Sequence, residues 1–283
     1  MTFVKINSFA YAKMRLYHMS IVFSIWRENM NAILQTKKLS KSFSNGGIQQ
    51  HVLKNVDMEI YEKDFTVIMG ASGSGKSTLL YAISGMDKPS LGTVTYKNGK
   101  ELNITDLSHD GLAEFRSKNC GFIFQQIYLV DSMSILDNVL LSGLLGSKDK
   151  KSVVEKAKNL LISVGIDERM FGKFPSQISG GEAQRVGMVR AVINAPAVLF
   201  ADEPTGALNS HNSKAVLDVL MKLNNQGQSI ILVTHDILSA MRANRILYLK
   251  DGQIIGELKL ERFIPENESR KKTIKDFLAG FGW

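Results

Sequence analysis

Apolar positions along this 283-residue chain follow two different periods. Three short continuous apolar runs, each ending in glycine or in polar residues, occupy residues 64–70, 197–204 and 229–236. Such runs are typical of parallel strands that are buried on both faces. Between the last two runs, apolar residues recur at helical spacing; they are Val216, Leu217, Leu220 and Leu223. The pattern predicts an α/β fold whose sheet is built from strand–helix–strand units.

The remaining patterns divide the chain further. Residues 132–178 show helical periodicity without strand-like runs and begin with a Ser-x-x-Asp capping pattern, so we expect an inserted helical subdomain there. An Asp251-Gly252 turn between two strand-like segments predicts a hairpin. We place the main domain at residues 30–255 and expect a helical C-terminal tail at residues 256–283.

The first 29 residues have a different character. Residues 16–26 form an apolar stretch behind two cationic residues, but no A-x-A cleavage site follows. The stretch is also shorter than the roughly 20 apolar residues of a membrane-spanning helix. We therefore interpret residues 1–29 as a dispensable extension ahead of Met30.

Composition changes this picture little. The chain is 44% hydrophobic and 22% charged, which is ordinary for a soluble globular protein. The net charge of +8 is compatible with an anionic partner, but the charges are scattered and no nucleic-acid module is recognisable, so we expect no specific nucleic-acid binding. The single cysteine, Cys120, cannot form an internal disulfide, which favours a reducing cytosolic compartment.

The loop after the first apolar run carries the clearest chemistry. Its sequence, GASGSGKST, fits G-x-x-x-x-G-K-[ST] and precedes a helical pattern over residues 77–86. Glycines allow backbone N–H groups to wrap a polyphosphate, Lys76 reaches the β- and γ-phosphates, and Ser77 offers a hydroxyl to Mg²⁺. The predicted ATP-binding residues of this loop are Gly70, Ala71, Ser72, Gly73, Ser74, Gly75, Lys76, Ser77 and Thr78.

An acidic pair ends the second apolar run. Asp202 and Glu203 stand at the carboxyl end of a predicted strand, where α/β sheets place ligands. We expect Asp202 to hold Mg²⁺ or its water, and Glu203 to orient and deprotonate an attacking water. Alone, the pair is equally well explained by a solvated turn. Together with the phosphate loop, it indicates hydrolysis of a nucleotide.

A second glycine motif, ISGGE at residues 178–182, lies a short way before the acidic pair. Its serine is a good N-cap, and its glycines let a helix N-terminus approach an anion closely, yet no lysine accompanies it. The motif is similar to the LSGGQ signature, and the ordered combination makes residues 30–255 resemble the nucleotide-binding domain of ATP-binding cassette transporters. The resemblance implies a P-loop NTPase (RecA-like) core with an antiparallel β subdomain and an inserted α-helical subdomain.

The same resemblance implies that two such domains pair head to tail, so that each signature caps the ATP on the other domain's phosphate loop. Contacts to the partner's ATP would come from Ser179, Gly180, Gly181 and Glu182, and from Asn209 in the D-loop. The family commonly has aspartate at the place of Asn209, so this chain keeps hydrogen-bonding capacity there but lacks a charge. The alternative for ISGGE is a helix cap with two incidental glycines, which needs no partner.

Three further positions correspond to the family pattern. Gln125 is similar to the Q-loop glutamine, which contacts Mg²⁺ or the attacking water. His235 resembles the switch histidine near the γ-phosphate, and Phe43 occupies the place of the aromatic residue that stacks on adenine. In isolation, these residues would be an ordinary loop amide, a structural histidine and a core or edge phenylalanine.

Within the family, the segments around Gln125, the signature and Asn209 resemble the branch of macrolide and lipoprotein-release exporters, and most of all bacitracin-type peptide antibiotic export ATPases. This implies a cytoplasmic ATP-hydrolysing subunit, bound through a separate permease to the membrane, that exports or removes antimicrobial peptides. The alternatives are a lipoprotein or macrolide exporter, an importer ATPase, and a soluble cassette ATPase acting on DNA or ribosomes. A non-cassette P-loop protein would leave ISGGE unexplained.

Overall fold

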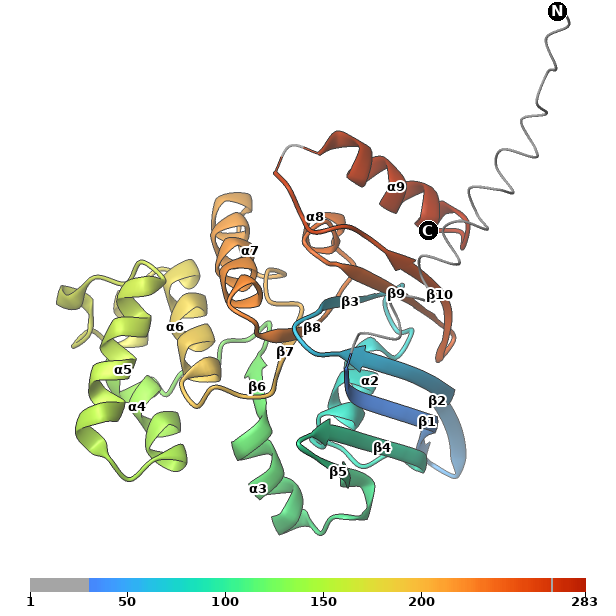
Figure 1. Ribbon diagram of the computed structural model, residues 1–283, viewed down its shortest axis with the longest axis horizontal. Coiled ribbons are helices and arrows are strands. Elements are labelled where there is room, and N and C mark those ends of the chain that lie inside the picture. The colour runs from blue at the N-terminus through green and yellow to red at the C-terminus, as the bar shows by residue number, and fades with distance from the viewer. Residues whose placement is uncertain (1–30, 266) are drawn as a thin grey trace, which may run out of the picture.

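The computed structural model describes residues 31–265 and 267–283, so the extension predicted at residues 1–29 lies outside the described residues. Figure 1 shows a central sheet, a second sheet drawn in blue and teal, and a group of helices in yellow-green and yellow on the opposite side.

The central sheet has six strands in the order β10-β9-β3-β8-β7-β6. Neighbouring strands are parallel except β9 and β10, which form the predicted antiparallel hairpin. The three predicted apolar runs are β3, β7 and β8, and every residue of these strands is buried. The strands are β3 (Phe65–Met69), β6 (Cys120–Ile123), β7 (Val198–Asp202), β8 (Ser229–Thr234), β9 (Arg245–Lys250) and β10 (Gln253–Lys259).

The second sheet is antiparallel and has the order β2-β1-β4-β5. It packs with helix α2 (Lys76–Ile83) and helix α3 (His109–Asn119) against one face of the central sheet in a single apolar cluster. The strands are β1 (Ala32–Asn45), β2 (Ile48–Tyr61), β4 (Leu91–Asn98) and β5 (Lys100–Asn103), and a short 3₁₀ turn (Ile104–Asp106) follows.

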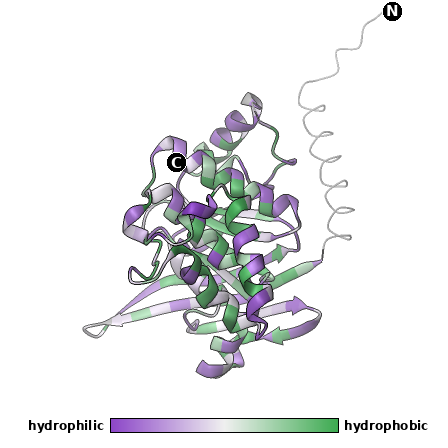
Figure 2. Cartoon of the chain, turned by 90° about the vertical axis from the view of Figure 1, so that its left-hand side faces the viewer, coloured by the Kyte–Doolittle hydropathy of each residue, from purple (hydrophilic) through white to green (hydrophobic). Residues whose placement is uncertain are grey.

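Helices α7 (Ser210–Asn225), α8 (Ile237–Ala240) and α9 (Glu268–Ala279) cover the other face of the central sheet. Alternate residues of β7 explain why its sequence reads as continuously apolar: Phe200 packs toward the antiparallel sheet, whereas Leu199 packs toward these helices. Figure 2 shows apolar residues gathered in the interior of the molecule and polar residues toward its periphery.

The helical group has its own apolar cluster, formed by α4 (Ile135–Gly146), α5 (Lys150–Ser163) and α6 (Gly180–Val192). The Ser134 hydroxyl accepts a hydrogen bond from the Asp137 N–H at 3.1 Å, which confirms the predicted cap. Because α6 shares this cluster, the helical group extends beyond residue 178. Two 3₁₀ turns, Glu168–Met170 and Pro175–Gln177, connect α5 to α6.

The architecture confirms the predicted fold class: an α/β core with an antiparallel β subdomain and a helical subdomain. The predicted helix in the C-terminal tail corresponds to α9. Among the described residues, no helix combines the length and the apolarity that crossing a bilayer requires.

Candidate active site

The predicted phosphate loop connects β3 to α2, and its backbone requires glycine at two places. Gly75 is the N-cap of α2 and has φ of 101°, in the left-handed region that favours glycine. A Cβ atom on Gly70 would lie 2.2 Å from the Leu249 carbonyl oxygen and 2.6 Å from the Ser74 hydroxyl. The loop therefore wraps tightly at the start of a helix, with no side chain filling the turn at these two positions.

Lys76 is a buried cation directed back over this loop. The residue is only 8% exposed, and its Nζ donates to the Gly70 carbonyl at 3.0 Å and to the Ala71 carbonyl at 2.9 Å. Burial lowers the pKa of Lys76, while the carboxylates of Glu203 and Asp202 act in the opposite direction. The loop thus holds a buried positive charge against two of its own carbonyl groups.

The Ser74 hydroxyl supports the same interpretation of the loop. It is buried and has no hydrogen-bond partner within the part of the chain that the structure describes. A buried hydroxyl without a partner is costly, so it marks a place where a polar ligand improves the site. Together with the buried cation and the helix N-terminus, it fits a polyphosphate.

Asp202 receives two hydroxyl hydrogen bonds from helix α2. Ser77 Oγ donates to Oδ1 at 2.9 Å, and the Tyr81 hydroxyl donates to Oδ2 at 2.8 Å. Burial, followed by the interaction with Asp202, raises the pKa of Tyr81 well above its ordinary value, so its hydroxyl remains a donor. The sequence analysis missed Tyr81; the available signal was its position four residues after Ser77, on the same face of the helix.

The oxygen atoms of Ser77 and Asp202 form a donor set that suits Mg²⁺. This ion usually binds one or two carboxylates together with waters and substrate phosphates, instead of a cage made only of protein groups. The described residues contain no cluster of three or more His, Cys, Asp or Glu side chains that could hold a metal by themselves. Ser77 belongs to the phosphate loop and bonds to Asp202, so phosphate oxygens on the loop would complete the coordination.

Glu203 and His235 meet at the ends of two adjacent strands. His235 Nδ1 lies 2.8 Å from Glu203 Oε1, and the Glu203 N–H donates to the Val233 carbonyl at 3.0 Å. Glu203 has φ of 46°, an uncommon value for a residue with a side chain, and such strain is often found at active sites. The Glu203 side chain is 18% exposed and that of His235 is 65% exposed, so the pair opens to solvent.

Gln125 follows β6 and is exposed. Its amide nitrogen lies against the loop after Glu203, because a Cβ on Gly206 would approach Gln125 Nε2 to 2.9 Å. The structure therefore brings Gln125 next to the loop that follows Asp202 and Glu203. It shows no hydrogen bond from Gln125 to Ser77 or Asp202 in the described part of the chain.

Helix α6 is attached to both of these loops by a glutamine that the sequence analysis missed. Gln184 is 2% exposed, and its Nε2 donates to the Phe124 carbonyl at 3.1 Å and to the Pro204 carbonyl at 2.9 Å. Arg190 of the same helix donates to the Ile127 carbonyl at 2.7 Å. The signal for Gln184 was a polar residue on an otherwise apolar helix face. These bonds connect the predicted signature helix to the segments that carry Gln125 and Glu203.

The predicted signature forms the N-terminus of α6. The Glu182 carboxylate accepts from the Ser179 N–H at 2.7 Å and from the Ser179 hydroxyl at 2.8 Å, and these bonds lower the pKa of Glu182. Ser179 and Gly180 are exposed. No hydrogen bond or ion pair among the described residues joins this motif to the phosphate loop of its own chain. The two predicted halves of the site are therefore separate within one chain.

The two glycines of the motif differ in their surroundings. A Cβ on Gly180 would have only ordinary contact, 3.7 Å from Leu208 Cδ2, whereas one on Gly181 would lie 2.6 Å from the Asn212 side chain. Asn209 has a local role, because its Oδ1 accepts from the Asn212 N–H at 2.9 Å and caps α7. Gly180 thus leaves open space at the exposed start of α6.

Phe43 lies on the antiparallel sheet that borders the phosphate loop. It is 44% exposed, and Lys41 Nζ lies 5.0 Å from the centroid of its ring. The neighbouring strand β2 contacts the loop, because a Cβ on Gly75 would be 3.0 Å from the Val52 carbonyl oxygen. An exposed aromatic ring is therefore available on the sheet next to the phosphate loop.

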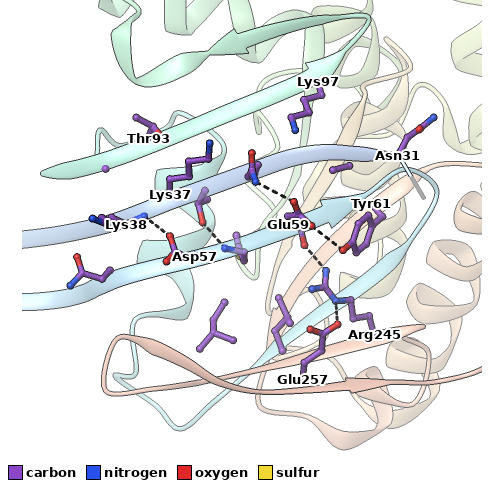
Figure 3. A pocket seen from close by; sticks show the side chains of 18 of the residues that line it. Asn31, Lys37, Lys38, Asp57, Glu59, Tyr61, Thr93, Lys97, Arg245 and Glu257 are labelled. Atoms are coloured by element: carbon purple, nitrogen blue, oxygen red, sulfur yellow. Dashed lines mark hydrogen bonds and ion pairs between the residues drawn. The ribbon is translucent and has the colours of Figure 1, made fainter. Parts of the chain in front are cut away.

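A groove of about 1660 Å³ lies elsewhere on the molecule. It lies between the antiparallel sheet and the β9–β10 hairpin, and no predicted site residue lines it (Figure 3). Two bonds join groups of its lining: Tyr61 donates to Glu59 at 3.1 Å, and Arg245 pairs with Glu257 at 2.8 Å. This groove therefore does not belong to the predicted site.

Comparisons with known proteins agree with the geometry. Residues 53–206 match the family model described as ABC transporter. The chain is 40% identical over 252 residues to the bacitracin export ATP-binding protein BceA of Halalkalibacterium halodurans, covering 89% of this chain and 96% of that protein. It is 40% identical over 223 residues to the lipoprotein-releasing system ATP-binding protein LolD of Idiomarina loihiensis, covering 78% and 96%.

It is also 41% identical over 222 residues to the macrolide export ATP-binding/permease protein MacB of Wolinella succinogenes, covering 78% of this chain but 34% of that protein. The chain therefore spans about a third of the length of the MacB proteins that it matches. A solved structure of the ATP-binding cassette MJ0796, a dimeric post-hydrolysis state bound to ADP and Pi, superposes with a TM-score of 0.74 at 38% identity, covering 81% of this chain and 100% of that one. The chain therefore belongs to the ABC transporter family, as one of its ATP-binding cassettes.

Proposed function

We propose that this chain binds and hydrolyses ATP and thereby drives a separate membrane permease. The permease would export or remove antimicrobial peptides. One observation carries the hydrolytic part of the proposal: the Ser77–Asp202 pair and the Glu203–His235 pair lie at the carboxyl ends of β7 and β8, beside the phosphate loop. Similarity to BceA over 89% of the chain supports the peptide-antibiotic class.

In the proposed mechanism, the adenine ring stacks on Phe43 and the phosphates lie on the loop amides. Lys76 exchanges its two loop carbonyls for phosphate oxygens, which gives its buried charge an anionic partner. Ser77 and Asp202 would hold Mg²⁺, which neutralises charge on the transferred phosphoryl group. Gln125 is placed to sense this centre from the loop that follows β6.

Glu203 acts as the general base in this mechanism. His235 bonds to its Oε1, and within the described part of the chain no hydrogen bond reaches Oε2, the oxygen that would accept a proton from the attacking water. The bond also fixes the direction of the carboxylate, because His235 comes from the neighbouring strand β8. A fixed carboxylate orients the water without a further loss of side-chain entropy.

The Glu203→Gln variant tests the assignment of the base. We expect ATP binding to be kept and most hydrolysis to be lost, because the amide cannot accept the proton. Glu101→Gln, at an exposed residue on β5, is the matched control and should retain the parental rate. Turnover of Glu203→Gln at the parental rate would exclude Glu203 as the base.

We further propose that two copies of the chain pair head to tail. The motif at Ser179 lies exposed and separate from the phosphate loop of its own chain, which supports a contact to a second subunit. In that arrangement the partner's Lys76 supplies the cation that ISGGE lacks. The dimeric cassette structure with 38% identity supports the pairing of two copies.

A pair of substitutions at Gly180 tests the dimer. Gly180→Asp and Gly180→Asn have nearly the same shape, and the space at Gly180 accepts a side chain. We expect the aspartate variant to lose hydrolysis through repulsion of the partner's γ-phosphate, while nucleotide binding to one chain is kept. The asparagine variant should lose much less. Equal rates of hydrolysis in the two variants would contradict the proposal that the partner's γ-phosphate lies next to Gly180.

Purification from washed membranes tests the transport role. We expect the chain to copurify with an integral membrane permease, whose identification by mass spectrometry also separates peptide export from lipoprotein or macrolide export and from import. Recovery with ribosomes or DNA would contradict the transport role. In this proposal the chain lies on the cytoplasmic face of the membrane because it is bound to the permease there.

A further inference from the structure

A buried arginine joins the C-terminal helix α9 to the segment that follows His235. Arg270 lies in the first turn of α9 and is 5% exposed. Its Nε donates to the Met241 carbonyl at 2.6 Å, and its two Nη groups donate to the carbonyls of Glu261 (2.8 Å) and Ala243. Met241 and Ala243 directly follow helix α8, whereas Glu261 follows strand β10. Figure 1 shows α9 above α8.

The segment held by Arg270 is the short helix α8, Ile237–Ala240, with the residues after it. At the start of α8, Asp236 accepts hydrogen bonds from the N–H groups of Leu238 and Ser239 at 3.1 Å and 2.8 Å. His235 immediately precedes this cap. A helix of one turn has little stability by itself, so its position depends on tertiary contacts. His235 is thus at one end of α8, and the arginine contact is at the other.

Helix α8 is also connected to the loop of the proposed base. Ser239 Oγ lies 3.5 Å from Thr205 Oγ1, two residues after Glu203, and His235 Nδ1 lies 2.8 Å from Glu203 Oε1. A shift of α8 would therefore change the geometry of the Glu203–His235 pair. In active sites, a misplacement of about 1 Å can lower the rate roughly 100-fold.

The chemistry of Arg270 indicates positioning more than simple packing. The anchoring of α9 to the core already comes from Ile274 and Leu278, which are 0% and 1% exposed in the cluster beneath the central sheet. Burying a guanidinium group costs desolvation free energy, and a planar fork bonded to three carbonyls requires one relative placement of its partners. An apolar residue would fill this space without fixing the carbonyls.

We infer that the C-terminal helix is part of the hydrolytic machinery, with Arg270 as a positioning residue that fixes His235 through helix α8. The inference rests on the proposed role of the Glu203–His235 pair in hydrolysis. It adds a function for the C-terminal tail: any partner or event that displaces α9 would lower turnover without touching the nucleotide.

The first test compares Arg270→Met with Arg262→Met in the full-length chain with its copurifying subunits. Arg262 is an exposed arginine nearby, and among the described residues the hydrogen bonds of its guanidinium go to Asn225 Oδ1. We expect Arg270→Met to lower kcat at least about tenfold with KM for ATP changed less than about twofold, and Arg262→Met to retain both values. A parental kcat in a folded Arg270→Met variant would overturn the inference.

A double-mutant cycle with His235→Ala separates positioning from general structural damage. If Arg270 acts through His235, Arg270→Met should cause no further loss of kcat in the His235→Ala background. Losses that multiply would overturn the inference while leaving the proposed function intact. A parental rate in His235→Ala alone would instead contradict the proposed role of His235. Should Arg270→Met fail to fold, Arg270→Lys takes its place in the same cycle, with the same outcomes.

Discussion

Substitution of Gln184 by methionine tests how helix α6 is held to the two loops of the site. The two side chains have similar length and similar helix propensity, so the change removes hydrogen bonds without a large cavity or a loss of helix stability. Gln184 Nε2 donates to the Phe124 carbonyl at 3.1 Å and to the Pro204 carbonyl at 2.9 Å. The variant therefore measures these two bonds.

The structure sets the expected magnitude. The contact with Phe124 is partly buried, so water can replace the lost donor and the cost is about 1 kcal/mol, as for one net hydrogen bond. The contact with Pro204 is buried, so its carbonyl is left without a donor at a cost of about 2 kcal/mol. We expect the free energy of unfolding to fall by about 3 kcal/mol, and the melting temperature to fall by roughly 6–12 °C for a chain of this size.

Urea titration followed by circular dichroism measures the free energy change, and differential scanning calorimetry measures the melting temperature. Gln253→Met, at an exposed residue on β10, is the matched control and should change the unfolding free energy by less than about 0.5 kcal/mol. A loss below about 1 kcal/mol in Gln184→Met would contradict the contribution assigned to the two bonds, because they cannot contribute so little if the Pro204 carbonyl stays buried.

Three further predictions concern other parts of the site and core. Tyr81→Phe removes one donor from the buried carboxylate of Asp202 and should lower the unfolding free energy by about 1.5–3 kcal/mol in urea titration; an unchanged value would contradict that bond. Gly206→Ala should slow ATP hydrolysis with little change in melting temperature. The new Cβ would lie 2.9 Å from Gln125 Nε2 and would push the Gln125 amide away; a parental rate would show that the position of this amide is dispensable. Burial raises the pKa of the Cys120 thiol to about 12, so Ellman's reagent should react with it much more slowly in the native than in the unfolded chain at about pH 8. Because folding raises this pKa, the contribution of the Cys120 thiol to stability is complete below its unfolded pKa of about 8.5 and is lost as pH rises toward about 12. Cys120→Ala should remove that part of the pH dependence of stability.

Those parts of the fold and site whose cause is local could be predicted from the amino-acid sequence. Strands β3, β7 and β8 were readable because both of their faces are buried, which makes every position apolar. The phosphate loop was readable for a similar reason: its glycines and Lys76 perform their roles within a few consecutive residues. The hairpin turn at Asp251-Gly252, where both residues have positive φ, is also a local feature.

The distant residues that support these motifs could not be predicted from the sequence and became visible in the folded chain. Gln184 and Arg270 bond to backbone carbonyls far away in sequence, and a carbonyl carries no sequence signal because every residue has one. Tyr81 gained its role from the strand that delivers Asp202, and Glu203 meets His235 because β7 and β8 are neighbours. Periodicity and motif spacing report on chemistry along the chain, whereas these contacts depend on the packing of separate elements against one another.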